Sequence, residues 1–580
     1  MPLAKAPGRA RPNPRDGCEA AALVIGLSGA SRNGGGLRHR PPRNAVLSDP
    51  PMARETVVQV RAGDVNRETT TNLEPCVSLK DAVAIADRWM RRSEFIRGSK
   101  RIATGLHELG VAEGDLVAIL MRNDFAVLQT YLAATDLGAY AVPFNWHSKA
   151  DEVRYLISDA SPKVLIAHAD LLAGVASVIP KQLKVIVVPT PPEAKRHYGI
   201  SDEMAAVPQG RVDWSSWSTQ WPPWEHPAIL TRGSIVYTSG TTGHPKGVKR
   251  EPMGPEQSER FSALVGRLFG RGGNVRAYVG GPLYHGMAGN FARFAAREAD
   301  LLILQAHFDP EGVLAAIERE RLTHLVMVPT MFVRMLKLPA ATRAQYDVSS
   351  LRWVIHTGAP CPADIKRAMI EWFGPVINEV YGSTEVGPVS LVSSQEWLAH
   401  PGTVGRPLPD TIVRIFNDTR ERCPPGEIGD IYVRNANVPN FSYHNLPSAR
   451  AALDLDGLLA TGDMGYLDAE GFLFLSDRRT DLIISGGVNI YPAEIERALI
   501  GMPGVLDCAV FGVPDAEYGR SVAAVIAVNG TVALSVSDVR GYLADKIANY
   551  KIPRTVIFDS NLPREESGKI AKAKLANRYG

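Results

Sequence analysis

The sequence alternates short apolar runs with longer amphipathic stretches, and this alternation restricts the fold more than any other feature. The apolar run LVAIL at residues 116–120 is followed by the helical stretch DFAVLQTYLAATDLG at residues 124–138, and THLVMVPT and LRWVIHTG continue the rhythm further along. Strands that alternate with helices predict a layered α/β core. In such cores, ligands bind where strands end in glycine-bearing loops.

The chain is too long, at 580 residues, for a single core, so we expect several domains or subdomains. After about residue 405 the pattern changes to short strands and turns, which predicts a small β subdomain. A compact and mobile α+β domain is expected after it. The predicted organisation is a disordered basic tail at 1–51, a large N-terminal domain of layered α/β subdomains at 52–476, a hinge at 477–480 and a small C-terminal domain at 481–580.

Charge and cysteine content indicate where the protein works. Residues 1–51 hold eight Lys or Arg and three acids, whereas the whole chain has a net charge of only +3. This Pro-, Arg- and Gly-rich arm fits disorder, a targeting or nucleic-acid arm, or a segment that precedes a natural start at Met52. The remainder gives no sign of a nucleic-acid partner. No run is long enough for a membrane span, and five scattered cysteines fit a reducing compartment, so we expect a soluble, cytoplasmic protein.

A loop rich in hydroxyl groups, glycine and lysine follows the strand-like run IVYT at residues 235–238. In TSGTTGHPKG, small residues let the backbone approach a ligand, hydroxyl and amide groups donate hydrogen bonds, and Lys246 adds positive charge. This combination predicts a surface that holds phosphate oxygens. The loop does not follow the Walker A pattern, because Gly247 and Val248 come after the lysine. Taken alone, its composition also fits a surface linker without a ligand.

Four further segments carry groups that suit a nucleotide. HTGAP at 356–360 makes a tight turn after an apolar strand, and YGSTEVG at 381–387 supplies an aromatic ring, a hydroxyl and a carboxylate. TGD at 461–463 offers an acid for paired ribose hydroxyls, and PREESGKIAK at 563–572 places Lys569 on a glycine-bearing turn. Each segment alone has an ordinary structural explanation, such as a core tyrosine, a turn aspartate or a solvated lysine. The set is specific.

Together these motifs resemble the adenylate-forming superfamily, which includes acyl-CoA synthetases, luciferases and the adenylation domains of peptide synthetases. YTSGTTGHPKG, YGSTE, TGD, DRRTDLIISGGVNIYPAEIE and the terminal SGK occur in the order of the family, from about residue 75 to the last ten residues. The resemblance implies an AMP-forming acid–thiol ligase of the fatty-acyl or bile-acid CoA ligase type. It also implies ATP, Mg²⁺ and coenzyme A as partners of the reaction.

Nucleotide contacts are carried over from the resemblance residue by residue. The loop around the ATP phosphates would consist of Thr238, Ser239, Gly240, Thr241, Thr242, Gly243 and Lys246. The turn and ring beside adenine would be Gly358, Ala359, Pro360 and Tyr381. The ribose hydroxyls would contact Asp463 and Arg478.

The resemblance implies that Lys569, Glu385 and Thr384 are the catalytic residues. Lys569 would bridge the acyl carboxylate and the α-phosphate, Thr384 would touch that phosphate, and Glu385 would bind Mg²⁺. A carboxylate is a weak nucleophile that a polyphosphate repels, so cations must neutralise both partners and hold them in line. The products would be acyl-AMP and pyrophosphate. The protein needs no covalent nucleophile, in agreement with the lack of a GxSxG motif.

A second step requires Lys569 to leave and a thiol to enter, so the C-terminal domain is expected to rotate. The pivot of the family is usually Asp or Lys, but it is Thr480 here, and Asp477 replaces the usual glycine before the ribose-binding arginine. Only eleven residues follow Lys569, so free CoA is the expected acceptor. The implied CoA contacts are Gly486, Gly487, Lys551 and Arg554.

The segment HGMAGNFARF at 285–294 matches the acyl pocket of the family and lacks the acid that pairs with an ammonium group in amino-acid-activating relatives. An unpaired buried ammonium is costly, so amino acids are poor candidates. Small residues that include Gly289 suggest a roomy pocket for a fatty, aryl-alkanoic or steroid-type acid, with implied contacts at His285, Gly286 and Gly387. Two alternatives stay open: an acyl-AMP ligase that loads a separate carrier protein, and a non-catalytic nucleotide-binding homologue, which would be expected to have lost Glu385 or Lys569.

Overall fold

The computed structural model describes residues 80–226, 230–238, 245–485, 488–515, 518–529, 534–564 and 570–579. These residues all belong to one compact unit, residues 73–580. The predicted tail at residues 1–51 lies outside the described residues. Across the described ranges, no helix combines the length and the apolar character that crossing a membrane requires.

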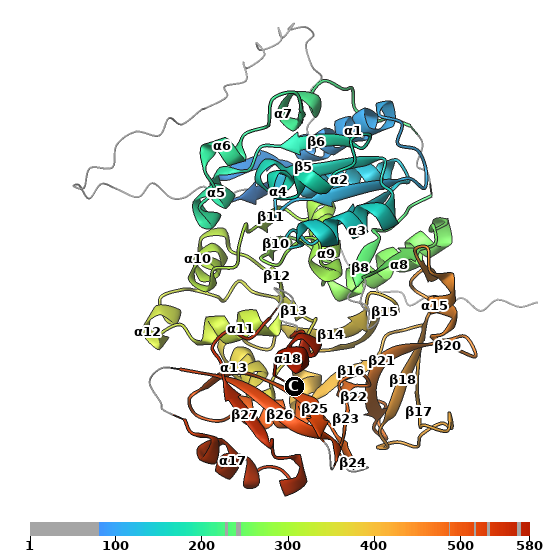
Figure 1. Cartoon of the computed structure of the whole chain (residues 1–580). Helices are drawn as coiled ribbons and strands as arrows, with labels where there is room; N and C mark the ends of the chain where they lie inside the picture. Colours follow the sequence, from blue (N-terminus) through green and yellow to red (C-terminus); the bar gives the residue numbers. More distant parts are fainter. Residues whose placement is uncertain are drawn as a thin grey trace, which may run out of the picture. The chain divides into compact units, whose positions relative to one another are not determined.

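A five-stranded parallel sheet forms the first α/β layer (Figure 1). Its strand order is β4-β3-β5-β6-β7, and the strands are β3 (Leu116–Leu120), β4 (Tyr140–Pro143), β5 (Val164–His168), β6 (Lys184–Val188) and β7 (Val212–Asp213). Every residue of β3 and β5 is buried, which explains why these strands are continuous apolar runs rather than alternating ones.

A larger sheet contains the parallel strands that lead to the nucleotide motifs. Five neighbouring strands run parallel in the order β11-β10-β12-β13-β14. Their bounds are β10 (Arg276–Val279), β11 (Leu301–Leu304), β12 (His324–Met327), β13 (Trp353–His356) and β14 (Ile377–Ser383). The connecting helices are α9 (Gly286–Glu298), α10 (Pro310–Glu320), α11 (Pro329–Leu336) and α13 (Ala363–Phe373).

The short strands predicted after residue 405 extend this sheet in antiparallel fashion. They are β16 (Thr403–Pro407), β17 (Thr411–Phe416), β18 (Gly429–Asn435), β21 (Leu458–Leu467) and β22 (Leu473–Arg478). β16 pairs with β15 (Gly387–Val392), which forms a hairpin with β14. The predicted β subdomain is therefore continuous with the α/β sheet through backbone hydrogen bonds.

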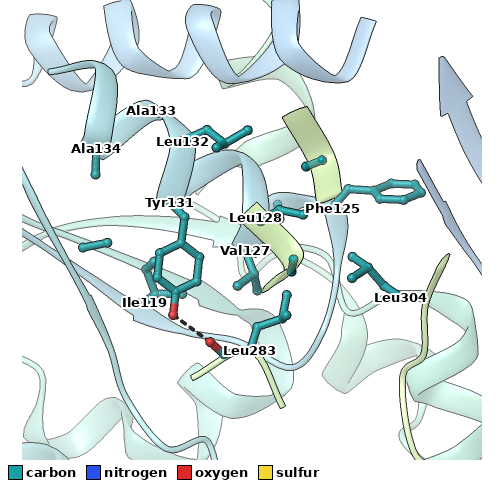
Figure 2. Close-up of a cluster of buried hydrophobic side chains, with 14 of the residues drawn as sticks. Ile119, Phe125, Val127, Leu128, Tyr131, Leu132, Ala133, Ala134, Leu283 and Leu304 are labelled. Atoms are coloured by element: carbon teal, nitrogen blue, oxygen red, sulfur yellow. Dashed lines mark hydrogen bonds between the residues drawn. The ribbon is translucent and has the colours of Figure 1, made fainter. Parts of the chain in front are cut away.

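Helix α2 (Phe125–Asp136) lies in the core between the layers, against α1 (Arg92–Glu108) and α9. Its residues 125–134 are all buried, so the helix is apolar on nearly every side and lacks the usual polar face. Figure 2 shows Tyr131 of α2 among Ile119, Val127 and Leu128, with its hydroxyl directed at the backbone of Leu283. That hydroxyl donates to the Leu283 carbonyl over 2.9 Å and fixes the segment that precedes α9.

The C-terminal part has its own apolar core and combines helices with strands, as expected of an α+β domain. Helix α16 (Pro492–Ile500) is followed by the antiparallel pair β25 (Val505–Asp515) and β26 (Gly519–Val528), then by α17 (Val536–Ala544), β27 (Thr555–Phe558) and α18 (Lys572–Tyr579). Strands β23 (Ile483–Ser485) and β24 (Val488–Ile490) form a separate ladder. The predicted fold class, a large α/β part with a small α+β part at the C-terminus, is confirmed.

Candidate functional site

The adenine-side motifs follow the carboxyl ends of two adjacent parallel strands. β13 ends at His356, which pairs with a residue of β14, and Tyr381 lies near the end of β14. The predicted turn of Gly358, Ala359 and Pro360 therefore starts at the sheet edge where Tyr381 is found. Gly358 has a φ of +93°, in the left-handed region that favours glycine, so the turn depends on this residue type.

Tyr381 is joined to the predicted ribose contacts by hydrogen bonds and charge. Its hydroxyl donates to Oδ2 of Asp463 over 2.7 Å, and Nε of Arg478 lies 3.3 Å from Oδ1 of the same carboxylate. Asp463 and Arg478 face each other in register on β21 and β22. Burial, and then the Asp463 charge, raise the pKa of Tyr381 well above its usual value. These three predicted residues therefore form one connected group.

At the predicted phosphate end, Glu385 accepts hydrogen bonds from the two outer strands of the three-stranded sheet β19-β9-β8. Thr238 at the end of β8 (Val236–Thr238) and Tyr443 at the end of β19 (Phe441–Tyr443) each donate a hydroxyl to Oε1 of Glu385 over 3.2 Å. Nζ of Lys246, which opens β9 (Lys246–Arg250), lies 5.4 Å from the centre of the Tyr443 ring. The predicted residues Thr238 and Glu385 are thus in direct contact, and the predicted Lys246 lies beside the tyrosine that shares this carboxylate.

The turn of the β14–β15 hairpin carries Thr384 and Glu385, and glycines fix its shape. A Cβ on Gly382 would lie 2.2 Å from the carbonyl oxygen of Gly387, so no larger residue fits there without a backbone shift. Gly387 itself has a φ of +73°. The hairpin therefore holds Thr384 and Glu385 at a fixed place beside Tyr381.

Arg250, the last residue of β9, supports the same turn from behind. One of its nitrogens donates to the carbonyl oxygens of Thr384 (2.7 Å) and Glu385 (3.1 Å), and another donates to that of Pro439 (2.8 Å). Burial lowers the pKa of Arg250 to about 10, so the side chain stays charged at neutral pH. The guanidinium thus joins β9, which follows the predicted phosphate loop, to the turn that carries Thr384 and Glu385.

Arg250 and Tyr443 are absent from the residues predicted by sequence. Arg250 lies four residues after Lys246 on an extended strand, and this even spacing places both on one face. That spacing was the available signal. Tyr443 gave none, because it reaches the site through the pairing of β19 with β9, which joins residues far apart in the chain.

Asp477, the acid that replaces the family glycine at the predicted hinge, has a structural role. Oδ2 of Asp477 accepts a hydrogen bond from the backbone N–H of Ala493 over 2.8 Å. Ala493 is the second residue of α16, where an N–H has no partner within the helix. Burial raises the pKa of Asp477, while the nearby Lys572 opposes the shift. Asp477 thus caps α16, the first helix after the predicted hinge, whereas Thr480 is exposed.

Near the predicted acyl pocket, glycines have two different environments. A Cβ on Gly286, the first residue of α9, would meet no atom within 4 Å, so this glycine borders open space. A Cβ on Gly289 would lie 2.6 Å from the Leu283 carbonyl oxygen. Gly289 therefore allows close packing instead of widening a pocket. His285 precedes α9 directly, and Asn123 accepts from the Leu283 N–H over 2.9 Å and helps to hold this segment.

The predicted CoA cations are paired with acids of the C-terminal part. Nζ of Lys551 lies 2.7 Å from both carboxylate oxygens of Glu494, and a nitrogen of Arg554 lies 3.5 Å from Asp515. The remaining predicted site residues lie outside the described residues: Ser239, Gly240, Thr241, Thr242, Gly243, Gly486, Gly487 and Lys569. Their roles stay predictions.

The side chains near the predicted phosphate loop suit a metal ion that is bound mainly by the phosphates of a nucleotide. Among the described residues, no three His, Cys, Asp or Glu side chains converge as a metal cluster. Glu385 is a single carboxylate beside the predicted phosphate loop. Mg²⁺ commonly binds through one or two carboxylates together with substrate phosphates, so Glu385 fits that role.

Comparisons with known proteins identify the family of the chain. The chain matches the family model described as AMP-binding enzyme over residues 76–440, and that of the AMP-binding enzyme C-terminal domain over residues 494–569. It is 34% identical to a feruloyl-CoA synthase from Amycolatopsis sp, over 84% of this chain and 94% of that protein. It is also 34% identical to the long-chain-fatty-acid–CoA ligase FadD13 of Mycobacterium tuberculosis, over 83% of this chain and 91% of that protein. The structure of ATP-bound MatB from Rhodopseudomonas palustris is similar with a TM-score of 0.74 and 28% identity, and the match covers 87% of this chain and 96% of MatB.

Proposed function

The chain belongs to the AMP-binding enzyme family, within the adenylate-forming superfamily, and from this premise we propose that it is an AMP-forming ligase that joins a hydrophobic carboxylic acid to CoA. One observation carries the proposal. A single hairpin, β14–β15, brings the Tyr381–Asp463–Arg478 group and the Thr238–Glu385–Tyr443 group to one sheet edge. A nucleoside triphosphate requires one group of residues for its base and ribose and another for its phosphates, and the two groups fit these roles.

The proposed nucleotide lies along this hairpin. Adenine stacks on Tyr381 beside the turn of Gly358, Ala359 and Pro360. The ribose hydroxyls bind the Asp463–Arg478 pair, and the phosphates extend toward Thr384 and the glycine loop. Lys246 and the hydroxyl groups of the loop, Thr238, Ser239, Thr241 and Thr242, donate to the phosphate oxygens.

The proposed chemistry has two displacements. The substrate carboxylate attacks the α-phosphorus and expels pyrophosphate, and the thiolate of CoA then attacks the acyl carbon and expels AMP. Lys569 neutralises and aligns the carboxylate in the first step, and Thr384 orients the α-phosphate. Mg²⁺, when bound at Glu385, would supply positive charge to the phosphates.

Between the two steps, the segment 481–580 turns about the hinge at 477–480 relative to 52–476. This motion carries Lys569 out of the site and brings Gly486 and Gly487 to the thiol channel. Lys551 and Arg554 then contact CoA phosphates. Lys551 must exchange Glu494 for a phosphate, which is a charge-for-charge replacement.

The proposed acid is hydrophobic: fatty, aryl-alkanoic or steroid-type. Gly286 borders open space, and the segment 285–294 offers no acid to pair with an ammonium group. Two relatives are named for feruloyl and long-chain fatty acyl groups, and the acids that correspond to these groups are hydrophobic. CoA rather than a carrier protein as acceptor, and a cytoplasmic location, belong to the same proposal.

A pyrophosphate-release screen tests the proposal. The full chain is incubated with ATP, Mg²⁺ and fatty, aromatic, steroid or amino acids, with and without CoA. We expect pyrophosphate with hydrophobic acids, and acyl-CoA with AMP once CoA is added. Release with amino acids only, or no cleavage of ATP to AMP with any acid, would contradict the proposal.

Lys569→Ala separates the two half-reactions. We expect it to lower adenylate formation at least about hundredfold, while thioester formation from supplied acyl-AMP stays largely intact. Lys574→Ala is the matched control, because Lys574 is an exposed lysine of α18 close by in the sequence. An equal loss of both half-reactions in Lys569→Ala would refute the assigned role.

A further inference from the structure

A buried cluster of ionisable side chains lies next to the turn that follows β13. Nζ of Lys366 is 2.5 Å from Oε2 of Glu379, and Nε2 of His356 is 3.6 Å from the same oxygen. The side chains of Lys366 and His356 are 0% exposed, and that of Glu379 is 11% exposed. Desolvation of a buried ion pair commonly offsets its attraction, so stability alone does not explain the pair.

Each member of the cluster belongs to an element that carries or adjoins a proposed adenine contact. His356 ends β13 directly before the turn with Gly358, and Lys366 lies in the first turn of α13, directly after it. Glu379 is paired with His356 across the two parallel strands. It also lies two residues before Tyr381 on β14, so both side chains are on the same face of the strand.

The surroundings of the cluster hold it in one arrangement. Nζ of Lys366 lies 4.9 Å from the centre of the Trp397 ring, and the His356 ring meets Phe332 edge-on at 5.2 Å between centres. Burial, and then the Lys366 charge, lower the pKa of His356 well below its usual value, so the imidazole is neutral. The Lys366–Glu379 pair therefore connects the α13 end of the turn to β14 in a medium of low polarity, where such a contact is strong, and backbone pairing connects the β13 end.

We propose that Lys366 and Glu379 are positioning residues that fix the turn 358–360 against Tyr381 and thereby set the preference of the site for adenine nucleotides. The pair does not touch the nucleotide. It acts through the turn, because the pair holds α13, which follows the turn, to β14, while backbone pairing holds β13, which precedes the turn, to the same strand. This inference rests on the proposed function and adds the origin of its base selectivity.

The test compares two buried ion pairs in the same sheet. Lys366→Met leaves the Glu379 carboxylate buried without its cation. Arg276→Met is the matched control: Arg276 opens β10 and so lies at the amino-terminal ends of the parallel strands, whereas the turn follows their carboxyl ends. One of its guanidinium nitrogens lies 3.3 Å from the Glu320 carboxylate, and both side chains are buried. Both variants are expected to lose stability, but only one pair adjoins the turn.

Affinities of the full chain for ATP and for GTP are measured by calorimetry, so no acid substrate is needed. We expect the wild type to prefer ATP, and Lys366→Met to lower the ratio of the two affinities about tenfold. Arg276→Met should keep the wild-type ratio. A ratio unchanged in Lys366→Met, lowered equally in Arg276→Met, or equal to one in the wild type would overturn the inference.

Two arrangements keep the result readable. Should Lys366→Met fail to fold, the double variant Lys366→Met/Glu379→Leu, which removes both charges of the pair, is measured instead. A lowered ratio of the ATP and GTP affinities would again support the inference, and an unchanged ratio would overturn it. Failure of the wild type to bind ATP at all would contradict the proposed function instead, before any variant is compared.

Discussion

Tyr381 donates its hydroxyl to Asp463 over 2.7 Å, and this hydrogen bond joins the end of β14 to β21, two strands that are separated by many residues in the sequence. Because Asp463 also faces Arg478, one carboxylate serves as the meeting point of three motifs. The aromatic face proposed for adenine is thus fixed in place by the acid proposed for ribose. Substitution of either residue should therefore change the position of the other side chain.

Replacement of Tyr381 separates stacking from hydrogen bonding. Tyr381→Leu should raise the KM for ATP at least about tenfold, since stacking of a base on an aromatic ring is worth about 1–3 kcal/mol. Tyr381→Phe keeps the ring and should raise it less. Steady-state pyrophosphate release with varied ATP measures both. Tyr278→Phe, in a buried strand of the same sheet, is the control. Equal KM values in the wild type and Tyr381→Leu would exclude stacking.

Removal of Arg250 should disable the catalytic turn. In Arg250→Met, the carbonyl oxygens of Thr384, Glu385 and Pro439 each lose a donor, and an unsatisfied buried group costs about 1–3 kcal/mol. We expect kcat to fall about hundredfold, because small displacements at a reacting centre are costly. The control is Lys249→Met, whose cation lies over the Tyr140 ring. Similar kcat values for the two variants would show that Arg250 does not position the turn.

Sequence patterns predicted the strands and helices of the core because their signals are local. The apolar run at 116–120 and the stretch at 124–138 contain β3 and α2, and the glycine-bearing loops follow strands as expected. The β subdomain was predicted as a separate element. Its backbone pairing to β15 through β16 could not be, since strand pairing across a long connection leaves no periodic signal in either strand.

Site residues that lie in sequence motifs could be predicted, whereas residues that strand pairing brings to the site could not. Thr238, Glu385, Tyr381 and Asp463 all lie in motifs, and in the structure each of them forms a hydrogen bond with another predicted site residue. Tyr443 lies in no motif and reaches Glu385 only because β19 pairs with β9. The cap that Asp477 forms on α16 was also beyond sequence, because it depends on the approach of a helix that begins well after it.

Loss of the Asp477 cap should loosen α16. Asp477→Ala removes the acceptor of the Ala493 N–H and should destabilise the C-terminal part by about 1 kcal/mol, whereas Asp477→Asn should retain most of the effect because asparagine also caps helices. Hydrogen exchange measured by mass spectrometry should be faster at the start of α16 in the alanine variant. Ser535→Ala, which removes the cap of α17, should instead affect α17 only. Unchanged exchange in α16 would contradict the role of Asp477.

Asp124 should make the N-terminal part sensitive to acid. Burial raises the pKa of this carboxyl, but a hydrogen bond from His168 and the charge of Arg88 outweigh it and lower the pKa from 3.8 to about 2. A carboxyl whose pKa is lower in the folded state stabilises the fold at pH values above its pKa in the unfolded state. The free energy of unfolding should therefore decrease by about 2 kcal/mol as pH falls from about 4 to about 2. Urea unfolding at several pH values measures this loss. Asp124→Asn should be less stable at pH near 5 and should show a shallower decline, and parallel curves would contradict the assignment.

Bulk at Gly286 should change which acids the enzyme accepts without harming its fold. A Cβ at this position meets no atom within 4 Å, so Gly286→Val adds volume to open space at the start of α9. We expect kcat/KM for the largest acids active in the screen to fall at least about tenfold, while kcat/KM for the smallest stays within about twofold, since a pocket discriminates by steric exclusion.

Gly174→Val, also unobstructed and on a helix, is the matched control and should leave the acid profile unchanged. Gly289→Val should instead destabilise the protein, because its Cβ would lie 2.6 Å from the Leu283 carbonyl oxygen. The same acid profile in Gly286→Val and the wild type would move the acyl site away from α9.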